Sequence, residues 1–271
     1  MRFPPDHSPH GGPPDFVGVG ATGAGATWWH RLLLAHPEVA APASRGRALH
    51  HFDGFCARAM TDADVAAYHE QFPRRDRTIA GEWTGRYMAD AWTPPLLRRA
   101  APRAKLLVML SDPIERYRAV FAERVANRGG RDRIYMADAV DRRCFGAQLA
   151  RLLRFFDRDR ILVLQLERCS RDPAGQYRRT LEFLGVRDTA FVPRRLRRSP
   201  LASLLRRGVP AGSRRRLAER LAGRPVRERQ PAPLWPDLEG ALHTAFDADV
   251  EALRELVPDL DLALWPNFAR L

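Results

Sequence analysis

The chain has 271 residues and 45% apolar residues, which suits one large globular domain with a sizeable core. No apolar run approaches the ~20 residues of a membrane-spanning helix, so we expect no membrane span. The formal net charge is +13, and because Lys105 is the only lysine, arginine carries almost all of it.

The charge favours anionic ligands, but arginine is spread through every segment and no nucleic-acid-binding signature occurs, so we expect no nucleic-acid partner. Residues 1–14 are rich in Pro, Gly and His and lack the apolar stretch of a signal peptide, which predicts a disordered lead-in. The three cysteines (Cys56, Cys144 and Cys169) share no metal-ligand spacing. We therefore expect reduced thiols, no metal site and a cytoplasmic location.

An apolar strand pattern at 16–19 leads into a loop that contains Gly20, Gly23 and Gly25, and a helical pattern follows up to His36-Pro37. A strand, a glycine loop and a helix together bind anions, because loop N–H groups turn inward and the helix N-terminus adds its positive dipole end. The pattern predicts a site for a phosphate, a sulfate or a pyrophosphate.

Three other interpretations of this loop stay open at this point. Gly20-x4-Gly25-Ala26-Thr27 has the register of a nucleotide-triphosphatase loop, but Ala26 stands where that loop has its lysine. Gly18-x-Gly20-x-x-Gly23 fits the dinucleotide fingerprint, although no acidic residue clearly ends a second strand. The loop can also be a tight turn without a ligand.

The rest of the chain alternates between strand and helix patterns. The expected elements are a polar turn at 42–55, a helix at 62–72 capped by Thr61 or Asp62, a short strand at 77–81, a helix at 94–101, a buried strand at 105–110, a helix from Asp112-Pro113 through Val125, a loop at 127–135, a helix at 141–156, a buried strand at 161–166 and a helix at 173–184 closed by Gly185. This order predicts a single-domain α/β fold with a P-loop-like, doubly wound parallel sheet flanked by helices.

We place the core of this domain at 15–190, with its ligand at the carboxyl ends of the strands. Residues 191–236 are rich in Arg and Pro and are predicted to form a basic lid or extension. Residues 237–271 are expected to form a C-terminal helix, at 238–256, and a tail that docks on the core.

Five motifs occur in a fixed order within 15–190. They are the glycine loop followed by His36-Pro37, Arg47–Asp53 (RALHHFD), Gly81–Tyr87 (GEWTGRY), Ser111–Phe121 (SDPIERYRAVF) and Glu167–Gly185, which contains SRDPAG and FLG. In this order and spacing they resemble the sulfotransferases that use 3′-phosphoadenosine 5′-phosphosulfate (PAPS), in the heparan-sulfate-type and bacterial branch. The resemblance implies PAPS as co-substrate, no metal, and a small-molecule or saccharide acceptor.

The chain departs from the family pattern at several cofactor positions. The loop lysine of the family is Gly23 here, and the first threonine of its pair is Ala26. The arginine and serine that hold the 3′-phosphate in the family are Ser111 and Ala119, and one of the two positions for a general-base glutamate is Ala48.

The resemblance implies two groups of cofactor-binding residues. The loop group is Gly23, Ala24, Gly25, Ala26, Thr27 and Trp28, and the 3′-phosphate group is Ser111, Arg116 and Ala119. For catalysis we favour Glu82 as the base that takes the acceptor proton, with His50 as a second base or an orienting partner. The alternatives are an ion pair between Glu82 and Arg86, and a structural role for His50.

Two functions therefore remain. The first is a sulfotransferase that moves a sulfuryl group from PAPS to a hydroxyl or amine, with arginines replacing the missing cations. The candidates for that replacement are Arg45, Arg47, Arg116, Arg118 and the basic segment at 194–198. The second is a catalytically degraded member that acts as a binding or regulatory module. The oligomeric state is not predicted.

Overall fold

The computed structural model describes residues 11–73, 76–119, 144–187 and 236–271. Its centre is a five-stranded sheet in the order β2-β3-β1-β4-β5, in which every pair is parallel. The strands are β1 (Phe16–Gly20), β2 (Val39–Ala40), β3 (Ile79–Trp83), β4 (Lys105–Leu110) and β5 (Ile161–Gln165). They are almost completely buried, as parallel strands covered on both faces must be. The predicted doubly wound α/β domain is confirmed.

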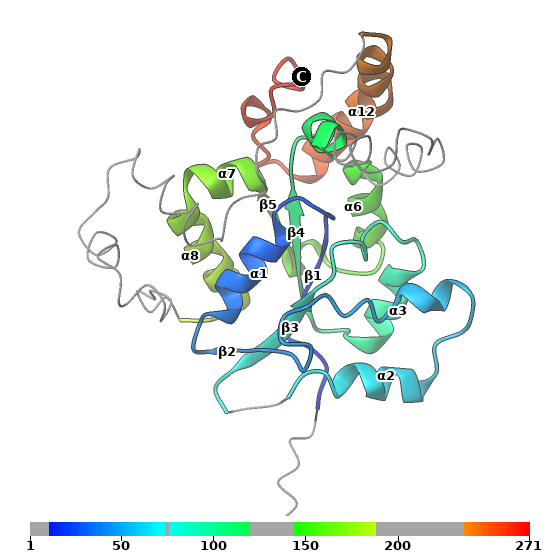
Figure 1. Cartoon of the computed structure of the whole chain (residues 1–271), viewed down its shortest axis with the longest axis vertical. Coiled ribbons are helices and arrows are strands. Elements are labelled where there is room, and N and C mark those ends of the chain that lie inside the picture. The colour runs from blue at the N-terminus through cyan, green and yellow to red at the C-terminus, as the bar shows by residue number, and fades with distance from the viewer. Residues whose placement is uncertain (1–10, 74–75, 120–143, 188–235) are drawn as a thin grey trace, which may run out of the picture.

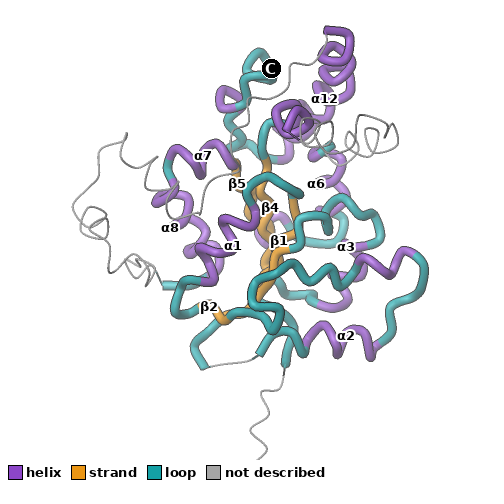
Figure 2. Tube along the Cα trace, in the orientation of Figure 1, coloured by secondary structure: helices purple, strands orange, loops and turns teal. Residues whose placement is uncertain are grey.

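Helices cover both faces of this sheet (Figure 1). One side carries α1 (Ala26–Leu34), α7 (Leu166–Arg171) and α8 (Pro173–Leu184), and the other carries α3 (Thr93–Ala100) and α6 (Phe145–Leu153). The helix α12 (Pro236–Leu256) packs on α6, and α2 (Asp62–His69) lies near α3. Figure 2 shows the strands as the central layer between these helices.

The local signals placed most elements correctly. Thr61 forms the expected cap of α2, in a box that is completed by Asp64, and Asp112 Oδ1 accepts the N–H groups of Ile114 and Glu115 at the start of the helical residues 113–119. Gly185 ends α8 with φ 76°.

One strand was misplaced by about two residues. We expected a strand at 77–81 followed by Glu82, but β3 spans Ile79–Trp83 and contains Glu82. Its register is set by pairing with both neighbours, Gly81 and Glu82 opposite Phe16 and Val17, and Ile79 opposite Val39.

Several expected segments lie outside the described residues. They are residues 1–10 of the lead-in, the loop at 127–135, positions 120–125 and 141–143 of two helices, and 188–235, which include nearly all of the proposed basic lid. Residues 11–14 are described, and Gly11 forms an antiparallel bridge with Pro73.

The tail after α12 lies against the core. Trp265 and Phe268 are fully buried, and the indole N–H of Trp265 donates to Glu167 Oε2 at 3.0 Å. Asn267 Nδ2 donates to Asp112 Oδ2 at 2.9 Å and to Glu115 Oε1 at 3.1 Å. The C-terminal segment thus holds the beginning of the 113–119 helix.

The order of the strands reverses between β1 and β4, which pair side by side while the chain leaves them toward opposite edges of the sheet. Ala21 N–H, just after β1, donates to Met109 O of β4 at 2.7 Å. In open α/β sheets such a switch point, at the carboxyl ends of the strands, is where ligands bind.

Candidate active site

The glycine loop occupies this switch point between β1 and α1. Gly23 and Gly25 have φ of 76° and 82°, a left-handed conformation that favours glycine. Gly25 is the N-cap of α1, no side chain caps that end, and its first turn contains no acidic residue. The N-terminus of α1 therefore keeps its partial positive charge for a ligand.

Side chains of the loop alternate between the core and the surface. Ala24 and Ala26 are buried, whereas Gly23 and Thr27 are exposed, and Trp28 is partly buried. Ala24 and Ala26 pack into the core, whereas the Gly23 backbone and the Thr27 side chain are exposed near the start of α1. Among the predicted loop residues, Thr27 thus has a side-chain donor that faces solvent at this N-terminus.

Arg116 brings a cation to the loop. A Cβ atom added to Gly23 would collide with the guanidinium of Arg116, so that group lies directly against the Gly23 backbone. Gly23 stands at the position of the lysine in the family pattern. Arg116 can therefore occupy this place only because the lysine is missing, since a side chain at position 23 would displace the guanidinium.

The other candidate arginines in the described residues lie elsewhere. Arg118 forms ion pairs with Glu115 at 3.1 Å and with Glu239 of α12 at 2.6 Å, so its charge is already matched. Arg45 and Arg47 are exposed in the turn before His50, and 194–198 fall outside the described residues. Of the candidate arginines that the structure describes, Arg116 is the one whose guanidinium lies against Gly23 of the loop.

The 3′-phosphate positions of the family lie next to β4. Ser111 follows the strand and is 5% exposed, and its Oγ hydrogen-bonds to no described residue. A buried hydroxyl without a partner is costly, so Ser111 has a donor available to a ligand at this edge. Ala119 is partly exposed on the 113–119 helix and offers no polar group.

Glu82 is completely buried. Its Oε1 accepts a hydrogen bond from Tyr68 Oη at 2.9 Å, and its Oε2 accepts one from Thr84 Oγ1 at 2.6 Å. Burial raises the pKa of Glu82, although the bonds from Thr84 and Tyr68 act in the opposite direction. The expected alternative partner, Arg86, pairs with Asp90 and Asp53 rather than with Glu82.

Glu82 and Thr84 also hold the segment that contains His50. Leu49 N–H points at Thr84 Oγ1 (3.1 Å) and Glu82 Oε2 (3.4 Å), and His50 N–H donates to Thr84 Oγ1 at 3.3 Å. His51 N–H donates to Tyr87 Oη at 3.0 Å. The buried polar residues at the end of β3 thus bind three successive backbone N–H groups of this segment.

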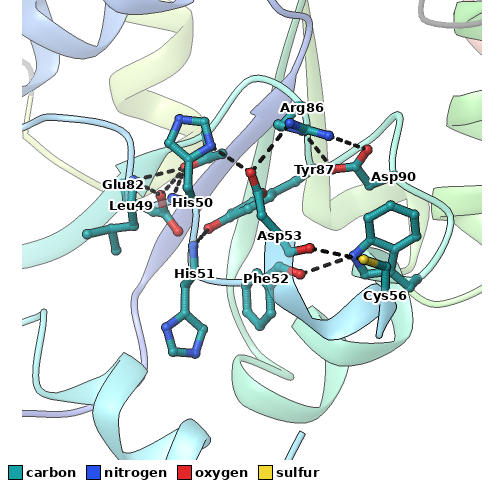
Figure 3. A network of polar contacts seen from close by, with 12 residues as sticks. Leu49, His50, His51, Phe52, Asp53, Cys56, Glu82, Arg86, Tyr87 and Asp90 are labelled. Atoms are coloured by element: carbon teal, nitrogen blue, oxygen red, sulfur yellow. Dashed lines mark hydrogen bonds and ion pairs between the residues drawn. The ribbon is translucent and has the colours of Figure 1, made fainter. Parts of the chain in front are cut away.

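His50 itself is on the surface, with a side chain 54% exposed. Its Nδ1 lies 3.1 Å from Asp53 Oδ2, and Arg86 lies 3.5 Å from the same oxygen while also binding Asp90. Figure 3 shows the rings of His50 and His51 on opposite sides of their segment, with Arg86 between the two aspartates.

The tryptophans near the site are mostly structural. Trp83 is 4% exposed, packs over Gly18 and donates to Gly20 O at 3.2 Å, and Trp29 is fully buried and donates to Thr180 Oγ1 at 3.1 Å. Both therefore serve the core.

Sequence reasoning missed the structural roles of Thr84, Tyr68 and Asp53. Thr84 and Asp53 belong to the quoted motifs, so they were visible but had no assigned role. Tyr68 lies in a helix with no motif, and only the tertiary structure brings its hydroxyl to Glu82. Within the described ranges, no group of three His, Cys, Asp or Glu residues is arranged to hold a metal ion. No described helix is long and apolar enough to cross a membrane.

No protein-family model matches the chain. Human heparan sulfate glucosamine 3-O-sulfotransferase 6 is 27% identical over 188 residues, which cover 64% of this chain and 53% of that protein. The membrane-associated sulfotransferase kil1 of Dictyostelium discoideum is 28% identical over 104 residues, 38% of this chain and 21% of that protein. The chain thus spans about half the length, or less, of these curated relatives.

Solved structures show the fold. A sulfotransferase from Alicyclobacillus acidocaldarius superposes with a TM-score of 0.64 at 22% identity and covers 93% of this chain and 98% of its own. The sulfotransferase domain of the Synechococcus PCC 7002 olefin synthase has a TM-score of 0.51 at 16% identity, covering 96% of this chain and 100% of that domain. The chain thus has the fold of these solved sulfotransferases, and its sequence is similar to those of the curated sulfotransferases.

Proposed function

We propose that the protein transfers a sulfuryl group from PAPS to a hydroxyl or amine of a saccharide or small-molecule acceptor. The observation that carries this proposal is the anion cradle at the switch point, where the glycine loop, the uncapped N-terminus of α1 and the Arg116 guanidinium converge. A phosphosulfate is an anion that such a cradle suits.

The donor set fits the group to be held. The loop N–H groups and Thr27 would hold the 5′-phosphosulfate, and Arg116 would stabilise the negative charge that develops as the bond between sulfur and the bridging oxygen breaks. Ser111 Oγ, buried without a described partner, would donate to another part of the nucleotide. These roles rest on the placement of the residues and on the family motif.

A binding or regulatory role is the second candidate function, because four cofactor positions of the family pattern are substituted in this chain. Gly23, Ala26, Ser111 and Ala119 together remove the side chains that bind the cofactor in the family, which suits a binding or regulatory module that has kept the fold. The cradle supports the enzyme instead, because Arg116 restores a cation at the position where the lysine is missing.

The acceptor class follows from the relatives alone. The curated name of the human relative describes a glucosamine sulfotransferase, which makes a saccharide hydroxyl the first acceptor to test. A phenol or an amine stays an alternative. Location in the cytoplasm remains a prediction from the cysteines.

Calorimetric titration with 3′-phosphoadenosine 5′-phosphate (PAP), the product nucleotide, tests the cradle. We expect micromolar binding that persists from low to moderate salt, because a built site is screened less than a diffuse arginine surface. Binding that vanishes with salt would indicate generic polyanion attraction and would contradict the proposal.

The variant R116M gives this test its specificity. We expect its Kd for PAP to rise about 10–100-fold, since a charge-assisted hydrogen bond contributes ~1.5–3 kcal/mol. The matched control is R31M, which removes the same charge from an exposed position in the last turn of α1 and should leave the Kd unchanged. Equal effects of the two variants would show that only the net charge matters.

A further inference from the structure

The helices α1 and 113–119 both begin at the carboxyl edge of the sheet, and their first turns differ in charge. The start of α1 has no side-chain cap and no acidic residue in its first turn. The 113–119 helix is capped by a carboxylate, because Asp112 Oδ1 accepts the N–H groups of Ile114 at 2.9 Å and Glu115 at 3.1 Å. The start of α1 can therefore hold an anionic ligand, whereas the start of the 113–119 helix already binds an anionic side chain of this chain.

More negative charge surrounds the start of the 113–119 helix. The backbone N–H of Asp112, next to Ser111, donates to Glu167 Oε1 at 3.1 Å, so a carboxylate also occupies this donor. Burial raises the pKa of Asp112 and of Glu167, and the charge of a neighbouring carboxylate raises each of them further. A phosphate placed at this junction would add to the repulsion between these groups.

The two arginines of the 113–119 helix have other partners or another place. Arg118 forms ion pairs with Glu115 at 3.1 Å and with Glu239 of α12 at 2.6 Å. The guanidinium of Arg116 lies against the backbone of Gly23, in the cradle proposed for the 5′-phosphosulfate. The charge of Arg118 is thus matched, and that of Arg116 is assigned to the 5′ end of the nucleotide.

Ser111 offers a nucleotide one neutral group at this junction. Its side chain is 5% exposed, and its Oγ hydrogen-bonds to no described residue. Ala119, the second 3′-phosphate position of the family pattern, has no polar side-chain atom. A hydroxyl can donate one hydrogen bond and accept others, which suits the 3′-hydroxyl of a ribose, whereas a phosphate dianion is bound best by cations or by several donors.

We propose that this protein does not select for the 3′-phosphate, and that it accepts adenosine 5′-phosphosulfate as a sulfuryl donor alongside PAPS, with Ser111 Oγ bound to the free 3′-hydroxyl. The proposal rests on the proposed sulfuryl transfer and concerns its donor. Both donors share the 5′-phosphosulfate that the cradle holds, so the 3′-phosphate adds little to the affinity.

The transfer step balances with this donor. The acceptor oxygen or nitrogen forms a bond to sulfur while the bond between sulfur and the bridging phosphate oxygen breaks. The electron pair of that bond leaves with adenosine 5′-monophosphate (AMP), and the acceptor proton passes to water.

Calorimetric titration with AMP and with PAP tests the proposal without turnover. Moderate salt is needed, because the net charge of +13 would otherwise favour the more highly charged nucleotide at any site. We expect the two Kd values to agree within about threefold. A site built for the 3′-phosphate would favour PAP by roughly 10–100-fold for each charge-assisted hydrogen bond. We also expect AMP release from adenosine 5′-phosphosulfate, with heparan sulfate or a phenol as acceptor.

A third nucleotide, 3′-deoxyadenosine 5′-monophosphate, tests the contact of Ser111. The wild type should bind it a few-fold more weakly than AMP, and S111A should bind the two equally, because the hydrogen bond to the 3′-hydroxyl is then missing from both. Equal binding of the two by the wild type would overturn the role of Ser111.

The variant S111R tests the converse, since it introduces a cation at this position. We expect it to favour PAP over AMP by about tenfold or more, and A119S, which adds one donor at a partly exposed position, serves if S111R does not fold. The matched control is A66R, which adds the same charge at an exposed position of α2 and should leave the ratio of the two Kd values unchanged.

Preference of the wild type for PAP by more than about tenfold would overturn this proposal, while the proposed sulfuryl transfer stands. A wild type that binds neither PAP nor AMP would overturn the proposed function, and this proposal with it.

Discussion

Because Gly23 has no side chain, the Arg116 guanidinium can lie directly against the loop. A side chain at position 23 should therefore weaken anion binding. In G23A the new Cβ meets the guanidinium, which is the flexible end of a side chain and can move away. We expect the Kd for PAP to rise about tenfold or more, as in R116M, and the free energy of unfolding to fall by about 1 kcal/mol because φ is positive.

The control for G23A is G54A, where an added Cβ would meet no described atom within 4 Å. In the double variant G23A/R116M the two losses of affinity should not add, because both remove the same contact. Calorimetry and denaturant unfolding measure the two effects separately. Additive losses, or unchanged PAP affinity in G23A, would contradict the role given to Arg116.

The residues also mark the limit of sequence reasoning at this site. The motif located Gly23, Glu82 and His50 correctly along the chain, but a motif carries no burial. Glu82 follows an apolar strand pattern, and nothing local shows that Tyr68 and Thr84 enclose it. The contact between Gly23 and Arg116 joins two segments far apart in sequence, so only the tertiary structure selects this arginine from the predicted candidates.

At the scale of one element, the N-terminus of α1 has the features of a helix end that is reserved for an anion. A carboxylate in the first turn normally stabilises a helix by about 0.3–1 kcal/mol, yet this first turn has none. We therefore expect T27D to raise the free energy of unfolding by about that amount and to abolish PAP binding by repulsion. T27A, which removes only the hydroxyl, should weaken binding by a few-fold. PAP binding by T27D at wild-type affinity would place the anion elsewhere.

Elements with strong local signals were predictable. The continuous apolar runs predicted β4 and β5, and the glycine at the C-terminal end of α8 predicted where that helix ends, all to within one residue. The short strand β3 was shifted because its bounds depend on pairing with β1 and β2. Propensity within five residues contains no information about such a register.

At the scale of the whole molecule, the C-terminal tail stabilises the helix that carries Arg116. The side-chain amide of Asn267 donates hydrogen bonds to the carboxylates of Asp112 and Glu115. Burial raises the pKa of Asp112. N267D would place a third carboxylate there. We expect it to lower the free energy of unfolding more than N267A does, and to weaken PAP binding by disturbing Arg116.

The pH dependence separates repulsion from lost hydrogen bonds. Relative to the wild type, the deficit of N267D should be largest near neutral pH and should shrink as the pH falls through the raised pKa of Asp112, because protonation removes the repulsion. N267A, which adds no charge, should show a deficit of about 1–2 kcal/mol that depends less on pH. Equal deficits in the two variants at both pH values would contradict the proposed clamp.

The whole fold was more predictable than the site, for a physical reason. Alternation of buried strands with helices constrains the chain to a parallel sheet with right-handed crossovers, so the architecture follows from the pattern. The pattern does not predict the contacts of the tail after α12. Trp265 donates to Glu167 and Asn267 donates to Asp112, and both hydrogen bonds depend on how the complete domain packs.

The most direct measurement is a single-turnover experiment with radiolabelled PAPS and excess protein, with heparan sulfate and with a phenol as acceptors. The account predicts that the label moves to one acceptor and that PAP appears in equal amount. Firm PAP binding with no release above the protein-free blank would contradict catalysis and would favour a binding module with the sulfotransferase fold.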